Sequence, residues 1–340
     1  MLLDFRAALL VMGLLLCVLG AAMIAPLLAD LSARNPDWRA FAESAAVTLF
    51  AGGALALANW GRVESMTRRS AFLLTAGAWI LLSAFAAAPF YYAGLDLSVA
   101  DAVFESVSGL TTTGATVLTG LDSMAPGILL WRAILQWIGG IGIIVMALAL
   151  LPMMRVGGMQ LFRLESSDTE DKLLPRATHI AGAIAGLYLT LTVLCALAYR
   201  ATGMSAFDAL NHAFTTIPTA GFSTHDLSFR YFDSPAIEWA GMVFMIAGAL
   251  PFLAYIRMVR GGTLTERIDP QVTALLGTLV VLVLLFAIWL HFEHDMDAGT
   301  ALTKAGFNII SIVTTSGFSS TDYVGWGSFA ATVFFILTFV

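Results

Sequence analysis

The amino-acid sequence predicts an all-α integral membrane protein, on two observations. Of its 340 residues, 59% are hydrophobic and only 12% are charged, whereas a soluble domain carries about 25% charged residues. The chain also contains several apolar runs of roughly 20 residues, the length that a helix needs to cross a bilayer. Within lipid the backbone groups need partners inside the chain, so we expect the spans to be helices.

Eight apolar segments are candidates for these helices. They lie at residues 5–28, 40–60, 71–92, 127–153, 178–200, 235–258, 272–292 and 326–340. The last is shorter than a full span, so we expect either a helix that is cut short or a tilted terminal helix. The first is too long for a signal-peptide core and lacks an A-x-A cleavage site, so we expect it to be retained.

The positive charges favour a cytoplasmic N-terminus. In that orientation 11 of the 17 Lys and Arg residues fall in inner loops and 5 in outer segments, as the positive-inside rule requires. Acidic residues gather in the outer segments, where they would raise the local concentration of cations. The two cysteines, Cys17 and Cys195, lie inside apolar spans and are expected to pack as small residues.

Three segments align without gaps, and each lies between two apolar spans. They cover residues 101–116, 208–223 and 304–319, with a glycine 13 residues after each start, at Gly114, Gly221 and Gly317. A helix of about 10 residues reaches only about 15 Å and cannot cross the membrane. We therefore predict a repeated unit of helix, short half-helix, Thr/Ser/Gly loop and helix, in which the half-helix enters the membrane and the loop returns.

The composition of these loops suits a path for cations. Glycine permits positive φ and close approach of the backbone, and loop carbonyls can replace the water shell of an ion. The C-terminal end of each half-helix adds a partial negative charge. The candidate ion-binding residues are Thr112, Thr113, Gly114, Thr219, Ala220, Gly221, Thr315, Ser316 and Gly317.

The loops also resemble those of the Trk/Ktr/HKT superfamily of potassium transporters, and within it the TrkH/TrkG branch. The matching segments are residues 111–116, 219–224 and 314–319 in the loops, and 136–142 and 247–252 in the helices that follow. The resemblance covers essentially the whole chain. It implies repeated helix–pore-loop–helix units around a central ion pore, with an extra N-terminal two-helix hairpin.

On this resemblance the chain divides into a hairpin, two complete repeats and an incomplete third repeat. The expected boundaries are residues 1–66, 67–160, 161–265 and 266–340. The fourth repeat is absent from this sequence, so we expect a truncated member of the family. Glycine at all three filter positions implies a preference for potassium over sodium.

The resemblance further implies a potassium-uptake subunit that is not an enzyme, with K⁺ as the transported ion and no covalent cofactor. It implies a homodimer, a cytoplasmic TrkA-like nucleotide-binding regulatory subunit and a location in the bacterial cytoplasmic (inner) membrane. A nucleic-acid partner is not expected.

Two other classes of function stay open. An ion-coupled secondary transporter of another cation, such as sodium, would also use broken helices near the membrane centre. A membrane-embedded enzyme, such as a lipid-modifying transferase, would need ionisable groups that converge at membrane depth. In this sequence the ionisable residues collect at the ends of the spans instead.

Polar residues around the three segments have structural interpretations. Glu105, His212 and Asn308 occupy the same position of the three segments, which favours a hydrogen bond at the side of each half-helix. Lys304 starts the third segment where the other two carry Asp, and a cation at a helix N-terminus opposes the helix dipole. Arg132, near the outer end of its span, is expected to snorkel to the interface.

Three further features have competing interpretations. The side chains within residues 291–297 could form a metal site by residue type, although a solvated helix end is favoured. Gly139, Gly140 and Gly142 are expected to allow tight helix packing. Residues 165–172 form a polar loop that either docks a partner or is a plain connector.

Overall fold

The computed structural model describes residues 5–61, 68–154, 173–252, 254–255 and 270–339. These residues are helical with short connections and contain no β-strand, which confirms the helical prediction. The predicted loop at residues 165–172 lies outside them. Five of the described helical segments are long and apolar enough to cross a membrane: Arg6–Ser32, Trp38–Ala58, Phe72–Tyr92, Ala181–Thr202 and Pro270–Glu293.

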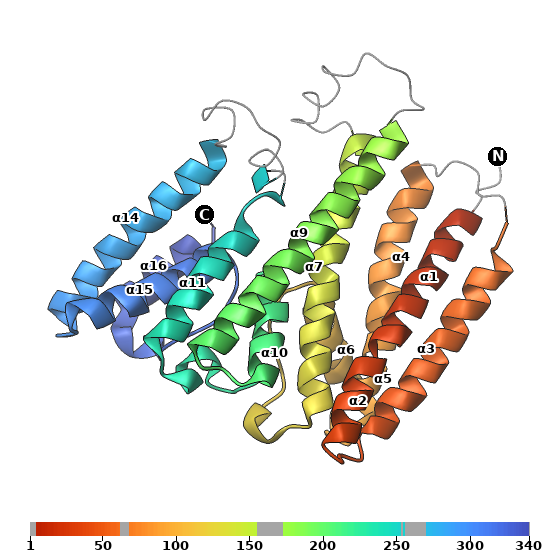
Figure 1. The fold of residues 1–340 in the computed structure, drawn as a ribbon, viewed down its shortest axis with the longest axis horizontal. Helices are drawn as coiled ribbons and strands as arrows, with labels where there is room; N and C mark the ends of the chain where they lie inside the picture. Colours follow the sequence, from red (N-terminus) through yellow and green to blue (C-terminus); the bar gives the residue numbers. More distant parts are fainter. Residues whose placement is uncertain (1–4, 62–67, 155–172, 253, 256–269, 340) are drawn as a thin grey trace. The chain divides into compact units, whose positions relative to one another are not determined.

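The chain divides into two compact units, whose helices are labelled in Figure 1. The first comprises Met1–Thr119 and Ser123–Ala177, and the second comprises Gly120–Asp122 and Thr178–Val340. The short segment Gly120–Asp122, which opens the 3₁₀ turn η1 (Leu121–Ser123), therefore belongs by its contacts to the second unit.

The first unit contains the helices of the predicted N-terminal hairpin and most of the predicted first repeat. Its helices are α1 (Arg6–Ala22), α2 (Ile24–Ser32), α3 (Trp38–Ala58), α4 (Arg68–Ala86), α5 (Ala88–Tyr92), α6 (Val99–Leu110) and α7 (Pro126–Met154). Helix α1 packs against α3 and α4, and α6 packs against α4 and α7. The short α6 is the predicted half-helix, and the loop that carries Gly114 follows it.

The second unit contains most of the predicted second repeat and the predicted third repeat. Its helices are α9 (Leu173–Thr202, which begins in the first unit), α10 (Ala206–Thr216), α11 (Pro235–Ala249), α14 (Pro270–Glu293), α15 (Ala298–Val313) and α16 (Gly327–Leu337), with 3₁₀ turns η3 (Ser228–Phe232) and η4 (Tyr323–Trp326). Helix α15 packs against α11, α14 and α16. The predicted half-helices correspond to α10 and α15.

Local sequence starts each half-helix. The side chains of Ser98 and Ser205 accept from the backbone N–H of Asp101 and Asp208, and Asp101 completes a capping box. Asp297 accepts from the N–H groups of α15's first turn. Such caps stabilise a helix start by about 1 kcal/mol each. The carboxylate of Asp297 therefore acts as a helix cap, in line with the favoured interpretation of residues 291–297.

Prolines interrupt two of the predicted spans. Pro26 lacks an N–H for the carbonyl of Ala22, and the first span breaks at Met23 between α1 and α2. The prediction of one continuous helix over 235–258 is wrong, because α11 ends at Ala249 and Leu250 is extended, with φ −68° and ψ 142°. Leu250 precedes Pro251, and a residue before proline disfavours the helical conformation.

Two glycines bring α1 and α3 together. A Cβ added at Gly13 would lie 2.8 Å from the carbonyl oxygen of Gly52, and one added at Gly52 would lie 2.8 Å from the carbonyl oxygen of Gly13. Small residues of this kind allow helix backbones to approach closely in a membrane. Gly53, the next residue of α3, has nothing within 4 Å of such an atom.

The close contact between Gly13 and Gly52 predicts that alanine has different effects on stability at the adjacent positions Gly52 and Gly53. Gly52→Ala should destabilise the protein by about 1–3 kcal/mol, because the extra methyl group forces α1 and α3 apart. Gly53→Ala should be neutral or stabilise by up to about 1 kcal/mol, because alanine favours the helix and meets no neighbour. The midpoint of thermal unfolding in detergent measures both, and equal midpoints would contradict the close packing.

Candidate functional site

The three glycine loops share one backbone conformation. Two residues before each glycine, a threonine has positive φ: Thr112 (57°), Thr219 (53°) and Thr315 (58°). The glycines have φ of 79° at Gly114, 82° at Gly221 and 77° at Gly317. Positive φ is strongly disfavoured for a β-branched residue. Three threonines strained at the same offset therefore show that each loop is held in place by its surroundings.

A backbone hydrogen bond fixes each loop to its half-helix. The N–H just before the glycine donates to the carbonyl six residues before the glycine. The bonds join Thr113 to Ser108 (2.9 Å), Ala220 to Thr215 (2.9 Å) and Ser316 to Ser311 (2.8 Å). Thus the candidate residues of the sequence prediction have the same geometry in all three repeats.

A buried ion pair holds the outer limb of the first loop, meaning the residues that follow Gly114. Glu105 on α6 accepts from the Thr116 hydroxyl (2.9 Å) and from the N–H of Val117 (3.2 Å). Arg132 on α7 donates to Glu105 at 2.7 Å, and the two side chains are 1% and 0% exposed. The prediction that Arg132 snorkels to the interface is wrong, because the buried carboxylate holds the guanidinium inside.

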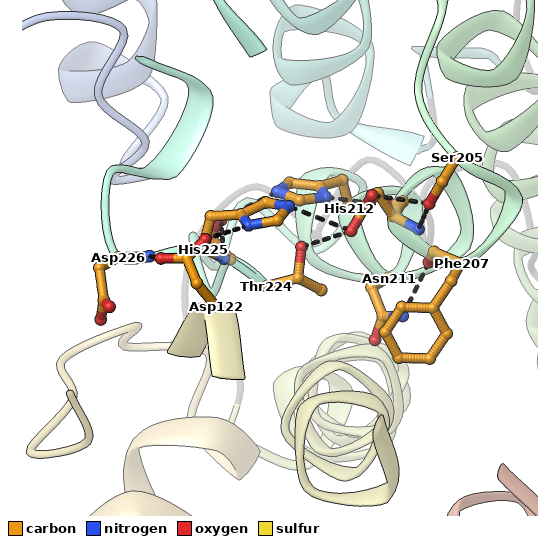
Figure 2. Close-up of polar contacts among 10 residues, drawn as sticks. Asp122, Ser205, Phe207, Asn211, His212, Thr224, His225 and Asp226 are labelled. Atoms are coloured by element: carbon orange, nitrogen blue, oxygen red, sulfur yellow. Dashed lines mark hydrogen bonds and ion pairs between the residues drawn. The ribbon is translucent and has the colours of Figure 1, made fainter. Parts of the chain in front are cut away.

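The outer limb of the second loop, which follows Gly221, is held by His212 and Asp208 of α10. The imidazole of His212 contacts the hydroxyl of Ser223 through Nε2 (3.0 Å) and the backbone carbonyl of Asp208 through Nδ1 (2.9 Å). The Thr224 hydroxyl donates to Asp208 at 2.7 Å. Figure 2 shows this cluster around His212 and Thr224. The predicted hydrogen-bonding role of His212 is confirmed.

The third loop is held by Asn308 and by Lys304. Asn308 bonds both the hydroxyl (3.2 Å) and the N–H (3.4 Å) of Ser320. Lys304 donates to the carbonyl of Ser320 (3.1 Å) and to the carboxylate of Glu238 on α11 (2.6 Å). The prediction of a cation at the N-terminus of the third half-helix is wrong, because α15 begins at Ala298 and Lys304 lies beyond its first turn, where the helix dipole has little effect. There Lys304 neutralises a buried carboxylate and holds the loop.

Glycines let the second and third loops and the helices behind them approach closely. A Cβ at Gly221 would overlap the carbonyl oxygen of Ser316, so these two loops lie in direct contact. A Cβ at Gly248 on α11 would meet the carbonyl of Ile217, where the second loop begins. In the first unit, a Cβ at Gly139 would overlap the carbonyl of Leu110, which confirms its predicted packing role.

This arrangement defines a class of protein: a membrane protein with re-entrant half-helices and backbone loops suited to a cation. The family model described as "TrkH: Cation transport protein" matches residues 38–340. The chain belongs to the TrkH family of cation transport proteins. Membership favours transport over the membrane-enzyme alternative.

Named relatives extend the likeness over nearly the whole chain. The chain is 44% identical to the Trk system potassium uptake protein TrkI of Halomonas elongata, over 97% of this chain and 67% of that protein. It is 38% identical to TrkH of Escherichia coli K12, over 99% of this chain and 71% of that protein.

A solved structure confirms the predicted fold class. The crystal structure of the potassium transporter TrkH from Vibrio parahaemolyticus matches with a TM-score of 0.87 at 35% identity, covering 99% of this chain and 70% of that chain.

Sequence reasoning missed the charged partners of the loops. Arg132 and Glu238 lie in apolar helices, and each pairs with a half-helix residue. A charge inside a membrane segment is costly and usually has a partner. The presence of Arg132 and Glu105 in neighbouring apolar segments was therefore a usable signal.

The buried Glu105–Arg132 ion pair predicts the relative stabilities of variants that lack one or both of its side chains. Glu105→Ala should destabilise the protein by about 3–5 kcal/mol, because it leaves Arg132 buried without its carboxylate. The double variant Glu105→Ala/Arg132→Met should be more stable than Glu105→Ala alone, because no lone charge remains. Unfolding free energies of the single and double variants measure this coupling. Strictly additive losses would show that the pair contributes nothing.

Proposed function

We propose that the protein takes up potassium through a filter lined by the three loops, as the membrane subunit of a Trk system. Two relatives from Halomonas elongata and one from Escherichia coli K12 carry the name Trk system potassium uptake protein. The observation that carries the proposal is the shared conformation of the loops, with positive φ at the same two positions of each. Backbone carbonyls of such loops can replace the hydration shell of a cation.

The proposed ion-binding groups are the backbone carbonyls of the loops. They belong to Thr112, Thr113, Gly114, Thr219, Ala220, Gly221, Thr315, Ser316 and Gly317. Each loop follows the C-terminal end of a half-helix, whose partial negative charge favours a cation. Potassium is the transported ion in this proposal, and side chains perform no covalent chemistry.

The proposal includes a setting for the subunit. The protein would lie in the bacterial cytoplasmic membrane with its N-terminus inside, in line with the distribution of Lys and Arg. It would work as a homodimer with a TrkA-like nucleotide-binding regulatory subunit. The repeats would have the boundaries 67–160, 161–265 and 266–340, after a hairpin at 1–66.

Substitution of one filter glycine tests the proposal. Gly221→Ser in the full-length protein should reduce the ratio of potassium to sodium uptake by about tenfold, or about 1.4 kcal/mol. The added side chain would press on the Ser316 carbonyl and displace a proposed ion ligand. Uptake in a bacterial strain that lacks its own potassium transporters measures the ratio.

Gly94→Ser is the matched control. Gly94 also has positive φ (66°), but nothing lies within 4 Å of its added Cβ, and it precedes α6. This variant carries a similar backbone strain away from the loops, so it should keep the wild-type ratio. If both variants retain wild-type selectivity, Gly221 has no part in ion discrimination. Sodium uptake by the wild-type protein that equals potassium uptake would favour the sodium-coupled alternative.

A further inference from the structure

His225 lies between two carboxylates just beyond the second loop. Its Nδ1 is 2.5 Å from Oδ1 of Asp122, and its Nε2 is 3.4 Å from Oδ1 of Asp208. Asp122 comes from the segment that follows the first loop, whereas Asp208 starts α10. Figure 2 shows the imidazole next to Asp122. One ring thus joins parts of the first and second repeats.

The two neighbouring carboxylates favour a hydrogen on both ring nitrogens. A neutral imidazole carries one N–H and one lone pair. If Nδ1 donated to Asp122 in that form, the lone pair of Nε2 would face a carboxylate oxygen. An imidazolium donates from Nδ1 to Asp122 and holds its Nε2–H 3.4 Å from Asp208, an ion-pair contact rather than a formed hydrogen bond, so that a positive charge lies between two negative ones.

We propose that protonated His225 is a positioning residue that clamps the segment Gly120–Asp122 to the outer limb of the second loop. The clamp makes potassium uptake sensitive to pH on the side of the membrane that this cluster faces. His225 follows Gly221 by four residues, and the clamped segment begins six residues after Gly114. Changes in the clamp therefore reach both loops through short stretches of backbone. This inference rests on the proposed function.

A second set of bonds holds the same segment. The carboxylate of Asp226 accepts from the N–H of Gly120 (3.0 Å) and of Leu121 (3.1 Å), and the N–H of Asp226 points at the other oxygen of Asp122 (3.4 Å). Two carboxylates, of Asp122 and Asp208, thus meet at one imidazole, and a third, of Asp226, holds the same segment through its backbone N–H groups. Loss of the imidazole's positive charge would leave them to repel one another.

The other groups around His225 are accounted for. Tyr231 of η3 stacks on the ring at a centroid distance of 3.4 Å, and Phe232 meets it edge-on. The positive charge of His225 in turn disfavours a second positive charge on His212 of α10. Burial disfavours the charged imidazole, but the interactions with Asp208 and Asp122 outweigh it and raise the pKa of His225.

The pKa values of the carboxylates of Asp122 and Asp208 are lowered, in the opposite direction to that of His225. The hydrogen bond from His225 is the main cause of a lowered pKa at Asp122. Burial would raise the pKa of Asp208, but interactions with His225, Ser205 and Thr224 hold it well below its usual range. The histidine's contribution to stability is therefore full below about pH 6.5 and is lost as pH rises through its raised pKa. The carboxylates' contribution is lost only in acid.

The test is the pH profile of potassium uptake by the full-length protein in proteoliposomes, with pH varied on each side separately. For the wild-type protein, the half-saturating potassium concentration should rise about threefold between about pH 6 and 9 on one side, the range of a partly exposed ion pair. His225→Gln should remove this dependence. His225→Lys should also give a flat profile, at the low half-saturation of the acidic wild-type protein, because its charge persists.

Asp122→Asn separates a charge effect from simple damage. It removes one counter-charge, so the midpoint of the pH profile should move to lower pH. His291→Gln is the matched control: this exposed histidine bonds the carbonyl of Met296, and its loss should leave the profile unchanged. A wild-type profile in His225→Gln, or an unmoved midpoint in Asp122→Asn, would overturn the proposal.

A second measurement does not depend on transport. Deuterium exchange of the imidazole Cε1 hydrogen, followed by mass spectrometry in detergent, gives the pKa of His225 directly. A pKa above about 6.5 that falls in Asp122→Asn supports the clamp, and an ordinary or lowered pKa overturns it. A wild-type protein that takes up no potassium refutes the proposed function, while this measurement still decides the charge state of His225.

Discussion

The polar backbone of the three loops must find hydrogen-bond partners inside the protein, because the membrane interior offers no water. Each loop meets this requirement in the same way. Its N–H before the glycine bonds the carbonyl six residues before the glycine, and a half-helix side chain nine residues before the glycine holds its outer limb. These bonds explain how three threonines can persist at a positive φ that would otherwise be unfavourable.

The side chain that anchors each loop differs among the three loops, and so does the charge that it brings into the protein. Glu105 needs the guanidinium of Arg132 because a buried carboxylate is costly without a partner. His212 and Asn308 are neutral or polar anchors, and the third loop gains a charge from Lys304 instead, which Glu238 balances. The repeats thus share a backbone geometry while their supporting charges differ.

Much of the fold could be predicted from the sequence. Apolar runs located the helices, and the equal offset of Gly114, Gly221 and Gly317 located the half-helices and loops. The breaks at Met23 and Leu250 follow from nearby prolines, a local signal that hydropathy alone passes over. Helix existence depends on local pattern, so it is the most predictable level.

The support of the site was less predictable. The partners of Arg132 and Lys304 are distant in sequence, since Arg132 follows Glu105 by 27 residues and Lys304 follows Glu238 by 66. Which charges meet depends on how the helices pack. The position shared by Glu105, His212 and Asn308 was predictable because the repeat supplies three observations of it.

The most direct measurement of the central claim is the position of a heavy potassium analogue. Crystals of the full-length protein grown with rubidium or thallium would give anomalous peaks at the bound ions. The account predicts peaks within coordinating distance of the carbonyls around Thr219 and Gly221 and of those around Thr315 and Gly317. Ions bound only at the acidic side chains near the loop ends, with none at these carbonyls, would contradict it.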